Sequence, residues 1–353
     1  MLTKKRYSIK DLVLWTRWET IGFIVFATIV SVLYNTLGLT FLRVPWTPVA
    51  LIGTAVAFII SFQNNAAYGR IWEARKIWGG IINASRTWGM KINDMISNEY
   101  ATVKVSEEEL AREKKEFIYR HIAWLTALRF AMRQPRKWEV FEEHHTNKEW
   151  AEAIHVPEKI TPIEDDLKCI ISKEEIDFIM SKNNKQATLL FLQSKHLKRL
   201  KEKGLIWEFS FLELENLLQE LFSLQGKTER IKNFPYPRQY ATLGHYFVRI
   251  FIVLLPFSIV PEFAKLGTTL ADNFPILSPY FAWLAIPFCS VVSWVFHTMQ
   301  RIGTVGENPY EGTANDVPIS TIARGIEIDL RQMLGEDEST IPGQFPEQYD
   351  VQM

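Results

Sequence analysis

Few side chains in the 353-residue sequence stand at spacings that support catalysis. The run Glu142–His145 (EEHH) combines carboxylates with imidazoles, which are common metal ligands. Adjacent histidines, however, do not share a helix face as a pair spaced by four residues would. The glycines of GTVGEN (residues 303–308) lack the strand and helix that frame a nucleotide-binding turn. We therefore expect a solvated loop at Glu142–His145, no metal ion, cofactor or nucleic-acid partner, and no enzymatic activity.

A different chemistry is indicated upstream of the segment SFQNNAAYGR (residues 61–70). Thr54, Phe58 and Phe62 recur every four residues, so they fall on one stripe of a helix. Several alanines flank this stripe, and small residues let membrane helices approach closely. The stripe could simply face lipid, because spacing alone does not separate a lipid-facing from a pore-facing position.

The amides of Gln63, Asn64 and Asn65 follow this stripe immediately. Three amide side chains at the end of a membrane span favour water or partner helices. An apolar stripe above an amide-rich mouth is typical of a pore constriction that loses its water easily. We predict that Thr54, Phe58 and Phe62 line such a constriction, called the neck below, with Asn64 and Asn65 at its wet lower lip.

The elements that would position these residues are long and apolar. Uncharged runs cover residues 20–42, 44–69 and 273–300, and a further apolar zone, residues 239–261, carries only Arg249. A helix needs about 20 apolar residues to cross a bilayer, whereas helices of soluble proteins average about 11–12 residues. The sequence thus predicts an all-α membrane protein with four transmembrane helices.

Basic residues predict how these spans are oriented. Lys and Arg gather before the first span and after the second, whereas the two other short linkers carry only Arg43 and Lys265. Segments that stay in the cytoplasm are enriched in Lys and Arg. We expect a multi-pass protein of the inner membrane with both termini in the cytoplasm. No small-residue cleavage site follows the first apolar run, so we expect no cleavable signal peptide.

Composition divides the chain into four parts. They are residues 1–69 (N-terminal segment and spans one and two), 70–238 (a cytoplasmic helical domain), 239–300 (spans three and four) and 301–353 (a cytoplasmic helix and tail). Apolar periodicity predicts amphipathic helices outside the membrane at residues 107–133, 174–204, 209–233 and 319–334. The acidic, proline-bearing end of the tail is expected to have no core of its own.

A single subunit with four spans cannot surround a pore with only one lining helix. A ring of identical subunits would place a belt of identical side chains at each level of the axis. We therefore expect a cyclic homo-oligomer in the lipid bilayer, with the second span at its axis and monovalent ions passing through it.

Three segments resemble signatures of the bacterial bestrophin-like proteins. They are FQNNAAYGRIWEARKIWG (residues 62–79), GKTERIKNFPYP (residues 226–237) and GENPYEGTANDVP (residues 306–318), in the expected order, and the resemblance covers roughly residues 5–335. The positions that carry the signatures are Arg70, Trp72, Glu73, Arg75, Trp78, Gly79, Pro237, Asn308 and Pro309.

The resemblance implies a homopentameric ion channel, passing chloride or other anions, with its pore on the fivefold axis. It also implies that the second span lines the neck at Thr54, Phe58 and Phe62, and that a lower cytoplasmic aperture lies near Phe209. Thr54 departs from the apolar residue usual in that family, which would make the outer end of the neck easier to wet.

Animal bestrophins are activated by calcium through a clasp of acidic residues after the last span. The corresponding region here offers one glutamate, Glu311, and one aspartate, Asp316. Because Ca²⁺ takes six to eight oxygen ligands, often several carboxylates, we expect no calcium gating.

Three alternatives stay open. A monovalent-cation channel of the same fold is one, since no ring of charged residues is evident in the second span. A secondary transporter would normally show inverted repeats and broken helices, and neither is evident. A membrane-anchored helical scaffold would conduct nothing, so ion flux in proteoliposomes separates it from the other two.

Overall fold

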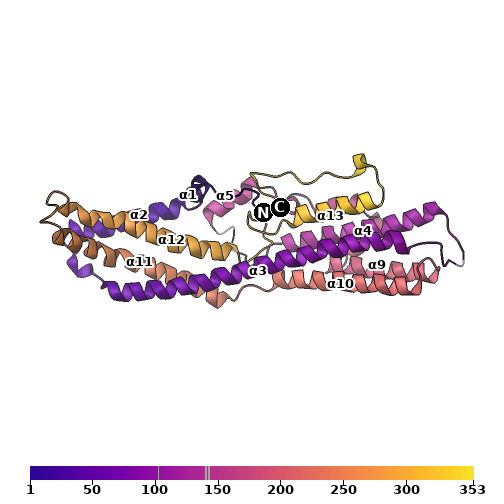
Figure 1. The fold of residues 1–353 in the computed structure, drawn as a ribbon, viewed down its shortest axis with the longest axis horizontal. Coiled ribbons are helices and arrows are strands. Elements are labelled where there is room, and N and C mark those ends of the chain that lie inside the picture. Colours follow the sequence, from indigo (N-terminus) through magenta and orange to yellow (C-terminus); the bar gives the residue numbers. More distant parts are fainter. Residues whose placement is uncertain (102, 140, 142–143) are drawn as a thin grey trace.

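The computed structural model describes residues 1–353 except residues 102, 140 and 142–143. The molecule is a long rod of helices, and α3 (Trp46–Met95) runs along most of it (Figure 1). Among the described residues, β-type pairing is limited to isolated bridges of Leu2 and Gln348 with Val351. The predicted all-α fold is thereby confirmed.

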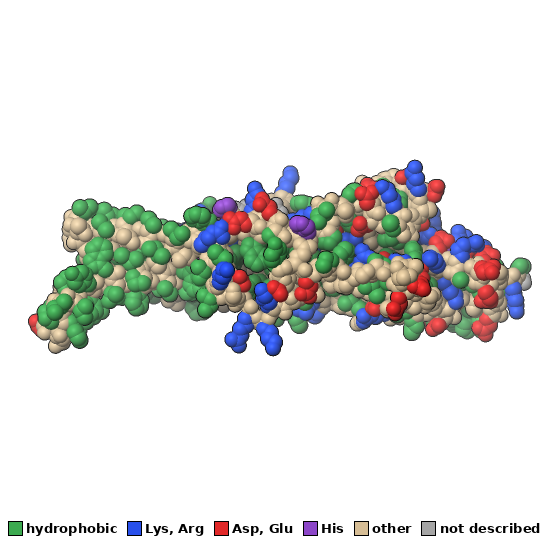
Figure 2. Space-filling view, turned by 90° about the horizontal axis from the view of Figure 1, so that it is seen from above, with side chains coloured by type: hydrophobic (Ala, Val, Ile, Leu, Met, Phe, Trp, Pro, Cys, Tyr) green, Lys and Arg blue, Asp and Glu red, His purple; other side chains and the backbone are tan. Residues whose placement is uncertain are grey.

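One end of the rod, called the apolar half, holds α2 (Arg17–Asn35), the first part of α3, α11 (Arg238–Thr269) and α12 (Ala285–Val305). The described chain contains four helical stretches long and apolar enough to cross a membrane. Figure 2 shows a surface almost without charged side chains at this end and many charges at the other. Four transmembrane helices were predicted, and the structure provides four.

The third span is longer than predicted. α11 continues to Thr269, past Pro256 and Pro261. A proline has no N–H to donate to the carbonyl four residues before it, so Pro261 leaves the carbonyl of Phe257 free. The backbone N–H of Val44 donates to that carbonyl at 3.1 Å, which repairs the lost hydrogen bond.

The fourth span begins and ends later in the chain than predicted, at Ser278 and Val305. Its helix begins at Ala285 rather than at residue 273, because the 3₁₀ helix η3 (Ser278–Leu284) first folds back against α11. Ser278 Oγ donates to the carbonyl of Gly267 at 2.8 Å, and a Cβ at Gly267 would lie 2.7 Å from the Ser278 carbonyl oxygen. The close approach therefore depends on a glycine.

The other end of the rod, called the polar half, contains the second part of α3 with α4 (Glu107–Arg133), α9 (Lys185–Glu202), α10 (Glu208–Asn233) and α13 (Ile319–Met333). Tryptophans 78, 88 and 124 are fully buried in its core. The shorter helices are α1 (Ile9–Trp15), η1 (Thr40–Leu42), α5 (His145–Ala153), α6 (Pro157–Ile160), α7 (Ile163–Lys168), α8 (Lys173–Met180) and η4 (Glu338–Thr340).

The predicted helix at residues 174–204 is two helices. α8 ends at Met180, and Asn184 caps α9 by accepting a hydrogen bond from the N–H of Ala187 at 2.8 Å. Asparagine favours caps over helix interiors because its side chain competes for backbone hydrogen bonds. The helices predicted at residues 107–133, 209–233 and 319–334 match α4, α10 and α13 within one residue.

The tail packs on other parts of the chain, which the sequence did not predict. Val351 and Met353 are buried in a small cluster with Ile154 and Val156. The two termini lie side by side at the middle of the rod (Figure 1), where the N–H of Gln352 donates to the carbonyl of Met1 at 2.9 Å. The tail is acidic on average and carries prolines, so the two apolar residues at its end, Val351 and Met353, were not expected to pack on the rest of the chain.

The predicted loop at Glu142–His145 is described only in part, because Glu142 and Glu143 lie outside the described residues. His144 is the residue before α5 and is partly buried, with Nδ1 3.7 Å from Glu19 Oε1. His145 begins α5. His145 is therefore exposed as predicted but lies in a helix, and His144 lies outside the helix as predicted but is partly buried.

Candidate functional site

One face of α3 in the apolar half is left uncovered by the residues that the structure describes. Phe58 and Phe62 are 63% and 72% exposed, and Thr54 is exposed on the same stripe. Val56 and Ile60 lie on the opposite face and are buried in the core of the apolar half. The structure thus brings the three predicted neck residues together as one continuous, uncovered stripe.

Close packing holds the back of α3 in place. A Cβ on Gly53 would lie 2.6 Å from the ring of Phe251 in α11, and a Cβ on Gly303 would lie 2.3 Å from Asn64 Oδ1. Such distances are far below van der Waals contact, so neither position accepts a larger residue without movement. Neighbouring helices therefore press against α3 from behind while its stripe stays open.

The three amides after the stripe point to different places. Asn65 is exposed, whereas Gln63 is 2% exposed and the Oδ1 atom of Asn64 is buried towards α12. Successive helical residues are about 100° apart, so three consecutive amides cannot share one face. Of the two residues predicted for the wet lower lip, Asn65 is exposed, whereas the Asn64 oxygen turns towards α12. The lower lip itself stays a prediction.

Arg70 links three parts of the chain. Its Nε donates to the backbone carbonyl of Glu307 at 2.7 Å, and its Nη2 donates to the carbonyls of Ile231 and Phe234, each at 3.0 Å. Since α10 ends and the segment after α12 begins at these carbonyls, one guanidinium fixes both to α3. Burial lowers the pKa of Arg70, with Glu307 and Glu73 opposing the shift.

The remaining residues of the first signature fall into two groups. Trp78 is fully buried, and Glu73 pairs with Arg230 of α10 at 2.5 Å. These two residues join α3 to the polar half.

Trp72, Arg75 and Gly79 belong to the second group and lie on or near the surface. The ring of Trp72 is 48% exposed and stacks on Tyr68 with ring centroids 6.2 Å apart. Arg75 is exposed, and a Cβ on Gly79 would meet nothing within 4 Å. No contact among the described residues explains why a glycine stands at position 79.

The other signature residues shape the turns around α11 and α12. Pro237 precedes the first residue of α11. Asn308 Nδ2 donates to Glu311 Oε1 at 2.6 Å, and the carbonyl of Pro309 accepts from the N–H of Val317 at 3.2 Å. Burial raises the pKa of Glu311 to about 8, and neighbouring acidic groups add to the shift.

Asp316 closes the loop after α12. Its carboxylate accepts hydrogen bonds from the backbone N–H groups of Gly312 (2.8 Å) and Thr313 (3.0 Å) and from the Thr313 hydroxyl (2.6 Å). Gly312 has φ of +92°, a conformation that favours glycine. Both acidic residues of this region therefore already have hydrogen-bond partners within the loop.

Phe209 lies far from the neck, at the start of α10 in the polar half. It is 62% exposed, and its ring centroid is 4.7 Å from that of Trp207. Trp207 in turn stacks on Tyr100 at 5.5 Å. The structure therefore places Phe209 in an exposed aromatic patch, separate from the stripe of Thr54, Phe58 and Phe62.

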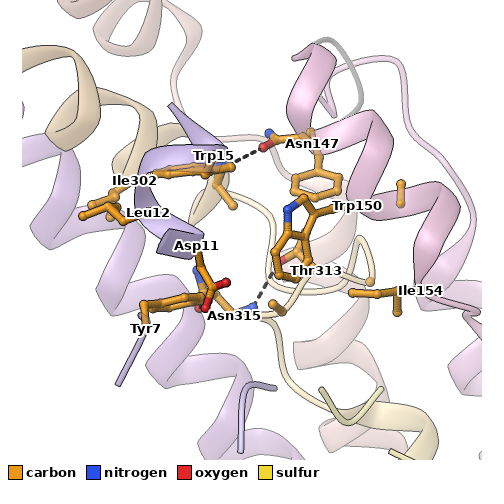
Figure 3. A pocket seen from close by; sticks show the side chains of 15 residues that line it. Tyr7, Asp11, Leu12, Trp15, Asn147, Trp150, Ile154, Ile302, Thr313 and Asn315 are labelled. Atoms are coloured by element: carbon orange, nitrogen blue, oxygen red, sulfur yellow. Dashed lines mark hydrogen bonds between the residues drawn. The ribbon is translucent and has the colours of Figure 1, made fainter. Parts of the chain in front are cut away.

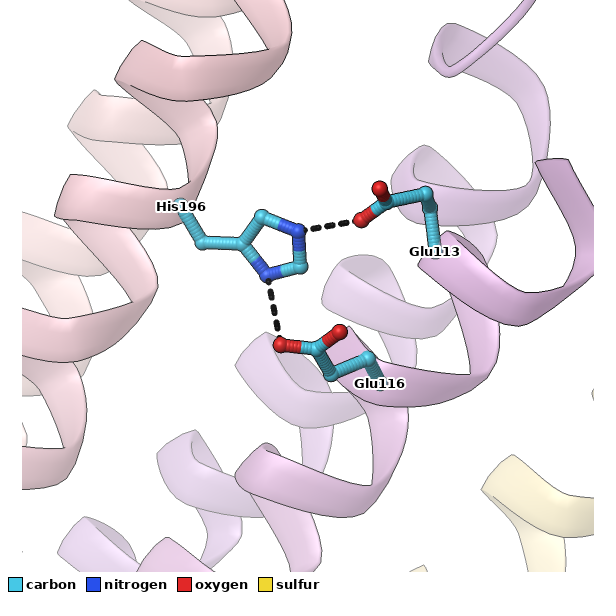
Figure 4. A group of neighbouring side chains, drawn as sticks. All are labelled: Glu113, Glu116 and His196. Carbon is cyan, nitrogen blue, oxygen red and sulfur yellow. Dashed lines mark hydrogen bonds and ion pairs between the residues drawn. The ribbon is translucent and has the colours of Figure 1, made fainter. Parts of the chain in front are cut away.

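A histidine and two carboxylates that sequence reasoning missed lie between α4 and α9 (Figure 4). His196 Nε2 is 2.6 Å from Glu113 Oε2, and His196 Nδ1 is 3.6 Å from Glu116 Oε1. Arg120 Nη1 donates to Nδ1 at 2.9 Å. Because the carboxylates lie at opposite ring nitrogens and an arginine occupies one of them, the geometry suits a hydrogen-bonded neutral histidine better than a metal ion.

A cavity of about 260 Å³ lies between α1, α5, the end of α12 and the loop of residues 312–315 (Figure 3). The rings of Tyr7, Trp15 and Trp150 line it, and Trp15 Nε1 donates to Asn147 Oδ1 at 2.8 Å. Its lining is mainly apolar, and α3 contributes none of it. The cavity is therefore distinct from the exposed stripe.

Glu307 is a charged residue that contacts the back of α3 just below the predicted neck and was not singled out from the sequence. It is fully buried in the turn after α12, where its Oε1 accepts from Gln63 Nε2 at 3.1 Å. Glu307 could have been singled out from the sequence because it stands beside Asn308 and Pro309, directly after a span. Nothing in the sequence indicated that it lies against Gln63.

Comparisons with known proteins agree on one family. A family model of bacterial and fungal bestrophin proteins matches residues 10–332. The voltage-dependent anion channel-forming protein YneE of Salmonella typhi is 25% identical over 310 residues, 88% of this chain and 82% of that protein. The voltage-dependent anion channel-forming protein RSc3414 of Ralstonia nicotianae is 25% identical over 290 residues, 82% of this chain and 78% of its own length.

The fold is also found in a solved structure. A bacterial bestrophin homologue from Klebsiella pneumoniae superposes with a TM-score of 0.68 and 21% identity, covering 91% of this chain and 99% of that one. With this fold and its four apolar helices, the chain is a multi-pass membrane protein.

Proposed function

Since this chain belongs to the bacterial and fungal bestrophin family, we propose that five copies of it form an anion channel with α3 at the axis. The relatives named as anion channel-forming proteins support ion conduction over catalysis. In this channel Thr54, Phe58 and Phe62 line the neck, Asn65 lies at its lower lip, and Phe209 lies at the lower aperture.

The observation that carries this proposal is the uncovered stripe of α3. Within the subunit Phe58 and Phe62 are left uncovered on the same helix whose back face, with Val56 and Ile60, is tightly packed. A ring of subunits would turn these side chains into apolar belts around a narrow path. Such belts obstruct ions by losing their water.

Between Arg43 and Arg70 the second span carries neither acidic nor basic residues, so partial charges in the neck would set the preference of this channel for anions. An aromatic ring has an electropositive edge, so a belt of Phe62 rings that turn their edges to the axis attracts anions. The hydroxyl of Thr54 offers a polar contact at the outer end of the neck.

The orientation follows from the charges at the middle of the rod. Figure 2 shows Lys and Arg side chains projecting where the apolar surface ends. Basic residues at the end of a membrane span mark its cytoplasmic side. The polar half and both termini, which meet at this boundary, therefore lie in the cytoplasm, with the spans in the inner membrane.

Single-channel recording in planar bilayers tests the proposal. Phe58→Ala and Phe62→Ala are expected to raise conductance, because a wider neck keeps its water more easily. Phe191→Ala is the control, since Phe191 is also half-exposed but lies on α9 in the polar half. Unchanged currents in both neck variants would remove α3 from the axis.

Two further measurements separate the alternatives. Reversal potentials in asymmetric NaCl are expected to follow the chloride gradient, and values that follow sodium would indicate a cation channel. Native mass measurement is expected to give five subunits. Absence of any flux in proteoliposomes would indicate a scaffold.

A further inference from the structure

Glu307 is a buried carboxylate directly behind the neck. It is completely inaccessible to solvent, and its Oε1 accepts a hydrogen bond from Gln63 Nε2 at 3.1 Å. Gln63 follows Phe62 in the same helix, so its side chain is anchored on the back of α3 at the level where the stripe ends. An α-helix with its side chains is about 10–12 Å wide, which places the carboxylate about one helix diameter behind the pore-facing surface.

Gln63 is held between two other helices as well. A Cβ on Gly244 of α11 would lie 3.2 Å from Gln63 Oε1, and a Cβ on Gly303 of α12 would lie 3.4 Å from Gln63 Cγ. Both glycines leave room that the glutamine side chain fills. Rotation of α3 at this level therefore requires the hydrogen bond between Gln63 and Glu307 to break.

The same glutamine has an unused hydrogen-bonding atom. Its Oε1 is buried and has no hydrogen-bond partner among the described residues. An unpaired buried acceptor costs about 1–3 kcal/mol. If Glu307 takes up a proton, its hydroxyl can donate to Oε1 once the amide turns over, so the two protonation states favour different arrangements of Gln63.

Two arginines face Glu307. Arg238, the first residue of α11, has Nη1 3.5 Å from Glu307 Oε2, and Arg70 of α3 donates to the Glu307 backbone carbonyl. Tyr236, in the segment before α11, is the other titratable group that interacts with it. Burial raises the pKa of Glu307, and the hydrogen bond from Gln63 and the two arginines only partly oppose this shift.

We propose that Glu307 is a positioning residue of the neck, which acts through Gln63 and holds the neck in a poorly conducting arrangement while the carboxylate is ionised. Uptake of a proton turns the Gln63 amide over, and this change of hydrogen bond shifts α3 into an arrangement that favours the passage of anions. The inference rests on the proposed function, because it assumes that Phe62 lines an anion path.

Conductance as a function of cytoplasmic pH tests this role. Linked sites typically change each other's affinity about 5- to 150-fold, so we expect anion conductance to rise at least about 5-fold from pH 8 to pH 5. The midpoint is expected above the ordinary range of glutamate. Glu307→Gln, which keeps the shape but not the charge, is expected to be pH-independent and as conductive at pH 8 as the wild type at pH 5.

Gln63→Met separates action through the glutamine from a direct effect of charge. This variant keeps Glu307 ionisable but removes the hydrogen bond, and we expect it to lose the pH response. Glu202→Gln, an exposed glutamate on α9, is expected to keep it. A wild-type channel without a pH response, or an unaltered response in either Glu307→Gln or Gln63→Met, overturns the inference.

Phe62→Ala in the same bilayers distinguishes this inference from the proposed function. Unchanged conductance in Phe62→Ala contradicts the proposed neck itself. Raised conductance in Phe62→Ala together with a full pH response in Glu307→Gln overturns only the role of Glu307. Subunit stoichiometry and thermal unfolding of every variant show whether it is folded, and Gln63→Met provides the test if Glu307→Gln does not assemble.

Discussion

The two parts of α3 are covered to very different extents although the helix has no break. In the polar half Trp78 and Trp88 are fully buried, whereas in the apolar half Phe58 and Phe62 are more than half exposed. Large side chains of the first kind stabilise the subunit, and those of the second kind are the ones that we propose line the pore. Substitutions along one helix should therefore separate stability from conduction.

The largest loss of stability is expected in the polar half. Trp88→Ala removes a fully buried ring that contacts Phe117 edge-on at 6.0 Å and should lower the free energy of unfolding by about 3–5 kcal/mol. Chemical unfolding in detergent, followed by circular dichroism, measures the loss. Trp72→Ala is the control, because Trp72 lies on the same helix but is half-exposed. An equal loss of stability in the two variants would contradict the expectation that the buried side chains of α3 stabilise the subunit more than the exposed ones.

Removing a buried charge in the polar half should lower the free energy of unfolding nearly as much as removing the ring of Trp88. Glu158 is fully buried beside Arg129 and Arg133 and accepts from Ser320 Oγ at 2.7 Å. Glu158→Gln removes the carboxylate that the two arginines share and leaves Asp166 beside Arg129 and Asp316 beside Arg133, so a loss of about 3 kcal/mol, the lower end for a broken buried ion pair, is expected. Glu202→Gln, an exposed glutamate on α9, should change stability little.

The pH dependence of this effect has a definite sign. Burial alone would raise the pKa of Glu158, but Arg129, Arg133 and Ser320 outweigh it and lower that pKa below its ordinary value. The contribution of Glu158 is therefore complete above the pKa of an unfolded glutamate and is lost as pH falls through the lower folded-state pKa. The difference in stability between wild type and Glu158→Gln should shrink on acidification, and a constant difference would argue against the ion pairs.

Alanine substitutions at two glycines should differ in their effect on stability by a smaller amount. Gly303→Ala places a methyl group 2.3 Å from Asn64 Oδ1 and should cost about 1–3 kcal/mol. Gly79→Ala meets open space within the subunit and should be neutral or stabilise the helix by up to about 1 kcal/mol. Thermal unfolding in detergent compares the two variants. Destabilisation by Gly79→Ala would show that another subunit packs on this residue.

The difference between local patterns and long-range contacts explains which predictions from the sequence succeeded. Long uncharged runs and period-four spacing are local properties, so the spans, α4 and the stripe of Thr54, Phe58 and Phe62 were predictable. The position of Asn64 was not, because it depends on where α12 approaches α3. The burial of Glu307 likewise requires residues more than 240 positions apart to meet, and no spacing within the sequence records that contact.

The smallest effect on stability is expected in the neck. Phe62 is 72% exposed, and substitutions at such positions usually change stability by no more than about 0.5 kcal/mol. Phe62→Ala should therefore unfold with nearly the wild-type free energy while its conductance rises. A loss as large as that of Trp88→Ala would mean that Phe62 is buried against a neighbouring subunit. Its side chain would then belong to the assembly interface, and Phe58 and Thr54 would have to form the neck without it.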